Sequence, residues 1–286
     1  MTKKGDYAFP FVNACILLAV AAATLFPFLH MLAVSLSSND AVLAGEVTLF
    51  PKGFQLKLYA NVLADTRVRS GYVNTIVYVT LGTAVSMIVT SMGAYALAKQ
   101  KLVFRKGFML MIVFTILFGG GMIPTFLVVN SLGIVNTVWA MALPTAVNTW
   151  NLIIMRTFFA NVPEELEEAG RMDGLTDLGI FARIVLPLSK PILATVGLFY
   201  AVAIWNNFYS ALLYLRDVDK FPLQLHLRNI LIVPEANITQ AGGDQQLPKK
   251  SLQFATIIVS SLPILLVYPF LQKYFVKGAL IGSVKG

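Results

Sequence analysis

Long runs of apolar residues, separated by shorter polar segments, set the organisation of this chain. Six runs each approach the ~20 residues that an α-helix needs to cross the hydrocarbon layer of a membrane. They cover residues 11–35, 72–98, 108–130, 137–159, 188–215 and 252–275. The runs lack the strict alternation of apolar and polar residues that is typical of membrane β-barrels. The pattern therefore predicts an all-α polytopic membrane protein with about six transmembrane helices, forming one domain over residues 1–286.

The composition agrees with a membrane location. Hydrophobic residues make up 57% of the 286 residues and charged residues only 13%, against roughly 25% charged in soluble domains. Mean hydropathy is +0.74. The net charge of +8 does not indicate a nucleic-acid partner, because basic residues normally accumulate on the cytoplasmic flanks of membrane helices.

The short connections between runs predict the orientation of the chain. The second connection carries Lys99, Lys101, Arg105 and Lys106, whereas residues 131–136 carry no charge. The rule that positive residues stay inside makes the first of these cytoplasmic and the second external. An even number of crossings then puts both termini in the cytoplasm. The first run is longer than the ~7–15 apolar residues of a signal peptide, so we expect a retained helix.

The polar segment of residues 161–187 interrupts the apolar pattern on the predicted cytoplasmic side. Asn161 is expected to cap a short helix that has Pro163 and glutamates in its first turn. Gly174 suits the left-handed residue that ends such a helix. Asp177 is expected to cap a second short helix. The segment therefore predicts two short helices on either side of a glycine break.

One face of the first helix looks suited to close contact with another protein. Leu166, Ala169, Gly170 and Asp173 follow the i, i+3, i+4, i+7 spacing of a single helix face. Small residues at two of these positions make the face shallow, so another backbone can approach closely. The alternative is an ordinary amphipathic loop helix with solvated glutamates, and we expect a docking role because the residue spacing is specific.

This segment resembles the coupling motif of permease subunits from binding-protein-dependent ABC importers, Glu-Ala-Ala-x-x-x-Gly, nine residues, then Ile-x-Leu-Pro. The matching residues are Glu168, Ala169, Gly174, Ile184, Leu186 and Pro187, and Gly170 stands where alanine is usual. The resemblance covers essentially the whole chain and points to the maltose-type carbohydrate branch. Residues 118–124, 151–156, 211–214 and 275–286 look like the subgroup that imports oligosaccharides from plant or algal polysaccharides, such as alginate or pectin fragments.

The resemblance implies a set of partners and a location. Such a permease pairs with a second homologous permease, two cytoplasmic ABC ATPase subunits and an extracytoplasmic solute-binding protein, in the bacterial cytoplasmic (inner) membrane. An oligosaccharide substrate then crosses the lipid bilayer by alternating access. The residues implied in coupling to the ATPase are Glu165, Glu168, Ala169, Gly170, Asp173, Gly174, Ile184, Leu186 and Pro187. A cytoplasmic tail, residues 276–286, is also implied to reach the ATPase interface.

The residues themselves do not predict an enzyme. The chain has no G-x-x-x-x-G-K-[ST] loop to cradle phosphates, so we expect ATP and Mg on the partner subunits and no cofactor on this chain. We also expect no metal site and no catalytic residue, because no suitably spaced His/Cys cluster occurs. The near absence of charges within the apolar runs argues against a proton- or sodium-driven carrier. An ATP-independent facilitator or channel is the alternative function.

Polar and aromatic residues in the fourth and fifth runs are candidates for the translocation pathway. Aromatic faces combined with amide groups suit sugar rings, which have apolar faces and hydroxyl rims. The candidates are Asn148, Asn151, Trp205, Asn206, Asn207 and Tyr209. The alternative role is hydrogen bonding between membrane helices. Glycines 119–121 interrupt the third run and predict either a hinge or a close-packing notch.

Overall fold

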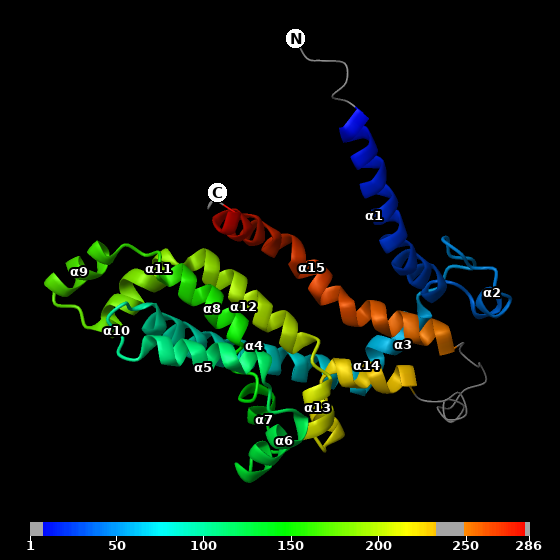
Figure 1. Cartoon of the computed structure of the whole chain (residues 1–286). Coiled ribbons are helices and arrows are strands. Elements are labelled where there is room, and N and C mark those ends of the chain that lie inside the picture. Colours follow the sequence, from blue (N-terminus) through cyan, green and yellow to red (C-terminus); the bar gives the residue numbers. More distant parts are fainter. Residues whose placement is uncertain (1–7, 233–248, 284–286) are drawn as a thin grey trace. The chain divides into compact units, whose positions relative to one another are not determined.

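The computed structural model describes residues 8–232 and 249–283, which form helices joined by turns, with no strand in these ranges (Figure 1). The chain divides into two compact units. Unit 1 comprises Met1–Arg69 and Leu227–Pro263, and unit 2 comprises Ser70–His226 and Ile264–Gly286. The predicted all-α class is confirmed, and the single domain stays a prediction.

Unit 1 contains one long apolar helix and a folded loop that follows it. Its helices are α1 (Ala8–Ser35), α2 (Asn39–Leu43), α3 (Lys57–Ala64) and parts of α4 (Thr66–Ala98), α14 (Leu223–Ile232) and α15 (Lys249–Ser283). The loop between α2 and α3 turns back on the end of α1. Its Lys52 N–H donates to Ser37 Oγ over 3.0 Å, and Ser38 N–H donates to the Lys52 carbonyl over 2.9 Å.

Unit 2 holds most of α4 and the short helices that follow it. These are α5 (Arg105–Leu117), α6 (Met122–Ser131), α7 (Val138–Ala142), α8 (Thr149–Phe159), α9 (Glu164–Met172), α10 (Asp177–Ile180), α11 (Leu186–Leu188), α12 (Lys190–Trp205) and α13 (Tyr209–Tyr214). A π-helical turn, Phe181–Val185, joins α10 to α11, and a 3₁₀ turn, Val218–Lys220, precedes α14.

Three helices in the described ranges are long and apolar enough to cross a membrane singly. They contain Phe9–Ser35, Thr66–Ala98 and Lys250–Val267, from the first, second and sixth predicted runs. Two bent pairs raise the number to as many as five: α5 with α6, at 115°, and the helix Asp177–Leu188 with α12, at 86°. The interruption predicted at glycines 119–121 is the break between α5 and α6, whereas the breaks in the fourth and fifth runs were not predicted, and the number of crossings stays a prediction.

The breaks in these runs have local causes. Gly121 adopts a φ of +82° between α5 and α6, a conformation that residues with a side chain rarely take. Pro144 lies in the turn between α7 and α8, where it lacks the N–H that would continue the helical hydrogen-bond ladder. After α12, Asn206 Nδ2 donates to the Val202 carbonyl over 2.9 Å, and the helix stops. The apolar runs continue through all three breaks, so hydropathy alone does not reveal them.

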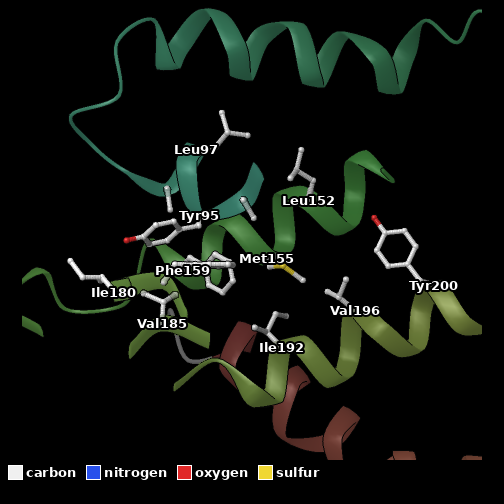
Figure 2. Packing of buried hydrophobic residues seen from close by; sticks show 13 residues of the cluster. Tyr95, Leu97, Leu152, Met155, Phe159, Ile180, Val185, Ile192, Val196 and Tyr200 are labelled. Atoms are coloured by element: carbon white, nitrogen blue, oxygen red, sulfur yellow. The ribbon is translucent and has the colours of Figure 1, made fainter. Parts of the chain in front are cut away.

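An apolar core joins α4, α8 and α12 in unit 2. Figure 2 shows Met155 of α8 in the middle of the group, with Tyr95, Leu152 and Val196 around it. Met155 and Val196 are completely buried. Packing of this kind has little free volume, so the three helices hold one another in a fixed arrangement. The residues that lead into and out of the 161–187 segment therefore start from a rigid base.

Candidate functional site

The first helix of the 161–187 segment is α9, and its N-cap lies two residues after the predicted cap, Asn161. Pro163 occupies the N-cap position, and the Leu166 N–H donates to the Pro163 carbonyl over 3.3 Å. Asn161 instead ends the preceding helix, since its Nδ2 donates to the Thr157 carbonyl over 3.1 Å. Asn161 is therefore not the cap of α9. The glutamates of the first turn do lie at the positive end of the helix dipole, as expected.

Gly174 ends α9 in the predicted way. Its φ is +80°, and it follows Asp173, the C-terminal cap. The Leu175 N–H donates to the Gly170 carbonyl over 2.9 Å, and the Gly174 N–H to the Arg171 carbonyl over 3.0 Å. These two bonds form a Schellman motif, which reverses the chain at the helix end. The left-handed conformation makes glycine the residue that fits here.

The second short helix of this segment begins with α10, and it is capped by Thr176 rather than by Asp177. Thr176 Oγ1 accepts a hydrogen bond from the Gly179 N–H over 3.3 Å. Asp177 becomes the first helical residue, and its carboxylate lies 3.4 Å from the Arg171 guanidinium. Both residue types are good caps, so the one-residue error reflects two equivalent candidates side by side.

The second helix widens before it reaches its proline. Over Phe181–Val185 the backbone is π-helical, and the Leu186 N–H reaches five residues back to the Phe181 carbonyl. Pro187 follows directly, and such widening is a recognised response where the regular hydrogen-bond ladder is disturbed. The chain then bends by 86° before α12, which has Pro191 in its first turn. The bend therefore sets the helix Asp177–Leu188 at a steep angle to α12.

Gly170 faces the chain's own second helix and not outward, which corrects the predicted docking face. Gly170 is buried, while Leu166, Ala169 and Asp173 are exposed. A Cβ atom at Gly170 would lie 2.7 Å from Ile184 Cδ1. The helix spacing was compatible with either direction, and the contact with Ile184 decides it. The glycine lets α9 pack closely on the second helix.

The structure divides the predicted coupling residues into an outer and an inner set. The exposed residues are Glu165, Glu168, Ala169, Asp173, Gly174 and Pro187, and the inner ones are Gly170, Ile184 and Leu186. Exposed apolar side chains accompany the outer set: Met172 is 87% exposed and Leu178 is 67% exposed. Within the inner set, Gly170 and Ile184 join the two helices and Leu186 packs against the apolar core, while the outer set is available to a partner.

Contacts with the end of α4 hold α9 in place, and sequence reasoning missed the residues that make them. Lys99 forms an ion pair with Glu167, and its Nζ lies 4.0 Å from the centre of the Tyr95 ring. A second pair joins Lys101 to Glu164 at 3.5 Å. The available signal was the run of lysines facing a glutamate-rich helix across the same predicted cytoplasmic side.

A groove lies beside these ion pairs. It has a volume of about 530 Å³ and is lined by the end of α4, the turn after it, the end of α8, α9 and α10. Lys99, Glu167 and Phe181 are among its lining residues. The groove is partly charged and partly apolar. Over the described ranges, no group of three or more His, Cys, Asp or Glu side chains gathers in a way that could hold a metal ion.

A comparison with known protein families shows which family this chain belongs to. Residues 88–281, which include the whole 161–187 segment, match the family model for the "Binding-protein-dependent transport system inner membrane component". This chain belongs to that family. It is therefore a permease component of a transport system, located in the inner membrane, as the resemblance indicated. Below, residues 161–187 are called the coupling segment, after the motif that they resemble.

Relatives of this permease cover nearly all of its length. It is 45% identical to the polygalacturonan/rhamnogalacturonan transport system permease protein YtcP of Bacillus subtilis, over 94% of this chain and 96% of that one. It is 46% identical to Protein LplC of Bacillus subtilis, over 100% and 97%. Among solved structures, a chain of the bacterial ABC transporter involved in the import of the acidic polysaccharide alginate matches with a TM-score of 0.88 and 36% identity, over 96% and 99% of the two chains.

Two of the candidate pathway residues lie at the start of α8 in this permease. Asn148 caps the helix, because its Oδ1 accepts from the Asn151 N–H over 3.1 Å. The Asn148 N–H donates to the Tyr200 hydroxyl of α12 over 2.9 Å, and that hydroxyl is 2.7 Å from Thr90 Oγ1 of α4. Asn148 thus belongs to a polar link among three helices, and Asn151 is buried beside it. A role in the translocation pathway stays a prediction for both.

The other four candidates lie at the break between α12 and α13. The Asn207 carboxamide bonds the Ser210 side chain and its N–H, at 2.9 and 3.0 Å. Tyr209 is exposed, and its hydroxyl lies 3.2 Å from Met122 Sδ. Trp205 is buried, and its Nε1 has no hydrogen-bond partner within the described part of the chain. Together with Asn206, these side chains define the break, and lining of a pathway stays a prediction.

Proposed function

We propose that this permease is a membrane-spanning subunit of an ATP-driven ABC importer that carries oligosaccharides into a bacterial cell by alternating access. ATP and Mg would be bound by two partner ATPase subunits, and this chain would bind no cofactor. A second, homologous permease would complete the pathway, and a solute-binding protein would deliver the substrate from outside. Both termini would lie in the cytoplasm, and the end of the 276–286 tail lies outside the described residues.

The geometry of the coupling segment carries the proposal. It projects Ala169, Glu168 and the exposed Met172 from a helix that is fixed from behind by the buried Gly170. A helix held in place on one side, with exposed apolar side chains on the other, suits a groove on a soluble protein. An ATPase subunit is the partner that an importer permease needs at this place.

The names of the relatives support a substrate class. Polygalacturonan, named for the permease YtcP, and alginate, named for the similar solved transporter, are both polymers of uronic acids. The shared chemistry is a carboxylate on each sugar ring. We therefore propose acidic oligosaccharides, rather than neutral ones, as the substrate of this importer.

The test is crosslinking combined with uptake in the assembled complex. A cysteine introduced as Ala169→Cys should capture an ATPase subunit, whereas a Ser131→Cys control on the uncharged turn should capture none. Reconstituted vesicles should take up a galacturonate or alginate oligomer in the presence of MgATP, and a neutral oligomer of equal length more slowly. Uptake that proceeds without the ATPase subunits would instead establish a facilitator or channel.

A further inference from the structure

The last turn of α4 contacts both helices of the coupling segment. Lys99 pairs with Glu167 of α9, and the Tyr95 ring lies 5.0 Å from the Phe181 ring of the π-helical turn, centre to centre. Phe181 in turn meets Phe159 at the end of α8, at 6.5 Å. The aromatic group is buried, as Figure 2 shows for Tyr95 and Phe159. The end of α4 therefore contacts both helices of the coupling segment, through Glu167 of α9 and through Phe181.

The Lys99–Glu167 pair differs in kind from its neighbour. Its side chains are only 24% and 11% exposed, and the Lys99 ammonium also lies over the Tyr95 ring. The Lys101–Glu164 pair is 81% and 57% exposed at 3.5 Å. Exposed pairs contribute little, whereas removing one partner of a buried pair leaves an uncompensated charge. The first pair is thus a structural link, and the second is a matched control.

The sequence does not join α9 to α4 through a short connection. Residues 160–163 join α9 to α8, and the helix Asp177–Leu188 joins it to α12 across an 86° bend. In contrast, α4 lies 68 residues earlier in the sequence, counted from Lys99 to Glu167. A displacement of α9 can reach the 33-residue helix α4 directly through this ion pair and the aromatic contact beneath it.

We propose that the Lys99–Glu167 ion pair, seated on Tyr95, is the mechanical tie that makes α4 move with the coupling segment when the ATPase subunits move it. The inference rests on the proposed function of the coupling segment and adds two positioning residues to it. Because motion passes between elements only where they stay in contact, a tie that is packed on both sides transmits better than a solvated one.

Charge reversal in the reconstituted complex tests the tie. Lys99→Glu and Glu167→Lys should each lower the uptake per ATP hydrolysed by about tenfold, and the double exchange should restore it to within about threefold. The control variants Lys101→Glu and Glu164→Lys should leave the ratio unchanged. Single reversals that leave the ratio unchanged, or a double exchange that restores nothing while the complex still assembles, would overturn the proposal.

A covalent replacement covers the case in which reversed charges disturb folding. With Cys15→Ser as background, Lys99→Cys and Glu167→Cys should together give an assembled but uncoupled complex. A flexible bifunctional thiol reagent should raise uptake per ATP to within about threefold of the parent, and cleavage of the reagent should abolish the gain. A crosslink that blocks uptake, or that leaves it uncoupled, would contradict a tie that stays closed during transport.

The failure of this proposal and that of the proposed function have different signatures. Every charge-reversal variant is also tested for capture of the ATPase subunit through Ala169→Cys in the Cys15→Ser background. Capture that persists together with a lower ratio supports the tie, and capture together with an unchanged ratio overturns the tie alone. Absence of capture in the parent complex would overturn the proposed function of the coupling segment itself.

Discussion

The two ends of unit 2 are built differently. At the end that carries the coupling segment, α4, α8 and α12 meet in a buried apolar group, and an ion pair closes it. At the other end the helices break, and short pieces such as α6, α7 and α13 follow one another. The first end has one large apolar group. At the second, smaller apolar groups around Met141 and Tyr214 are supplemented by hydrogen bonds to polar side chains.

Asn136 shows how the broken end is held. It adopts a left-handed φ of +62° in the turn between α6 and α7. Its N–H donates to the Tyr214 carbonyl over 2.8 Å, its Oδ1 accepts from the Arg216 N–H over 3.0 Å, and its Nδ2 donates to Asp217 Oδ2 over 2.8 Å. One residue thus adds hydrogen bonds between two segments that also meet in the small apolar group of Val129, Ala140 and Tyr214.

This difference suggests a division of labour within one unit. A large close-packed group resists gradual deformation and moves as a body, whereas short segments held by smaller apolar groups and exposed hydrogen bonds open at lower cost in free energy. We expect the coupling end to transmit displacement and the broken end to absorb it. Four changes, ordered from the largest expected effect to the smallest, test this comparison.

The largest effect is expected from truncation in the packed group. Met155 is completely buried, so Met155→Ala should lower the free energy of unfolding by about 2–5 kcal/mol, through lost transfer energy and a remaining cavity. Met172→Ala, at an exposed position, should leave stability unchanged. Thermal unfolding of the purified protein in detergent measures both. Equal losses for the two variants would remove the distinction between packed and exposed positions.

A change at Gly174 should affect function more than its cost in stability suggests. Gly174→Val forces a β-branched residue into a left-handed conformation, at a cost of about 1–2 kcal/mol. The Schellman motif would shift, and the position of α9 relative to the second helix of the segment would change with it. We expect membrane insertion to persist and uptake to fall by about tenfold or more. Unchanged uptake would show that the coupling segment tolerates a different turn.

The hydroxyl of Tyr200 tests the polar link between three helices. Tyr200→Phe removes its contacts with Thr90 and with the Asn148 N–H, and should lower the free energy of unfolding by about 1 kcal/mol. Tyr209→Phe, whose hydroxyl meets only a thioether among the described residues, should have almost no effect on stability. Unfolding midpoints of the two variants give the comparison, and a larger loss for Tyr209→Phe would reverse it.

The smallest effect is expected from the titration of Asp217. Hydrogen bonds from Lys220 and then from Asn136 hold the pKa of its carboxyl below the usual 3.8. A depressed pKa means that the contribution to stability is fully present above pH 3.8 and is lost as the pH falls through the depressed value. Asp217→Asn should therefore lower the unfolding midpoint slightly at pH 7. The difference from the parent should shrink in strong acid, and a constant difference would contradict this assignment.

The sequence predicted the long helices well, and among the breaks it predicted only the interruption at glycines 119–121. Length and hydropathy identify α1, α4 and α15, because a long uncharged run has few other stable structures in a membrane. The breaks after α5 and α12 lie inside equally apolar runs, and their polar groups find partners within the chain. Hydropathy reports transfer into lipid, so it does not register a bend that neighbouring helices stabilise.

At the coupling segment, the local signal at Gly174 worked, the two predicted N-caps were displaced by one or two residues, and long-range contacts were not predicted. Gly174 was predictable because its conformation is a property of one residue. The direction of Gly170 was not, since the same helix face fits a partner or the chain's own Ile184. The pairing of Lys99 with Glu167 depends on how α4 and α9 meet in space, and no short-range pattern encodes that meeting.

The buried ion pair has a consequence for biosynthesis. Lys99 leaves the ribosome 68 residues before Glu167, which is a delay of several seconds at about 5–20 residues per second. During this interval the lysine has no Glu167 to neutralise it and must remain hydrated at the membrane surface. The nascent chain therefore carries an unmatched positive charge next to a newly inserted helix, and such a charge favours retention on the side where translation takes place.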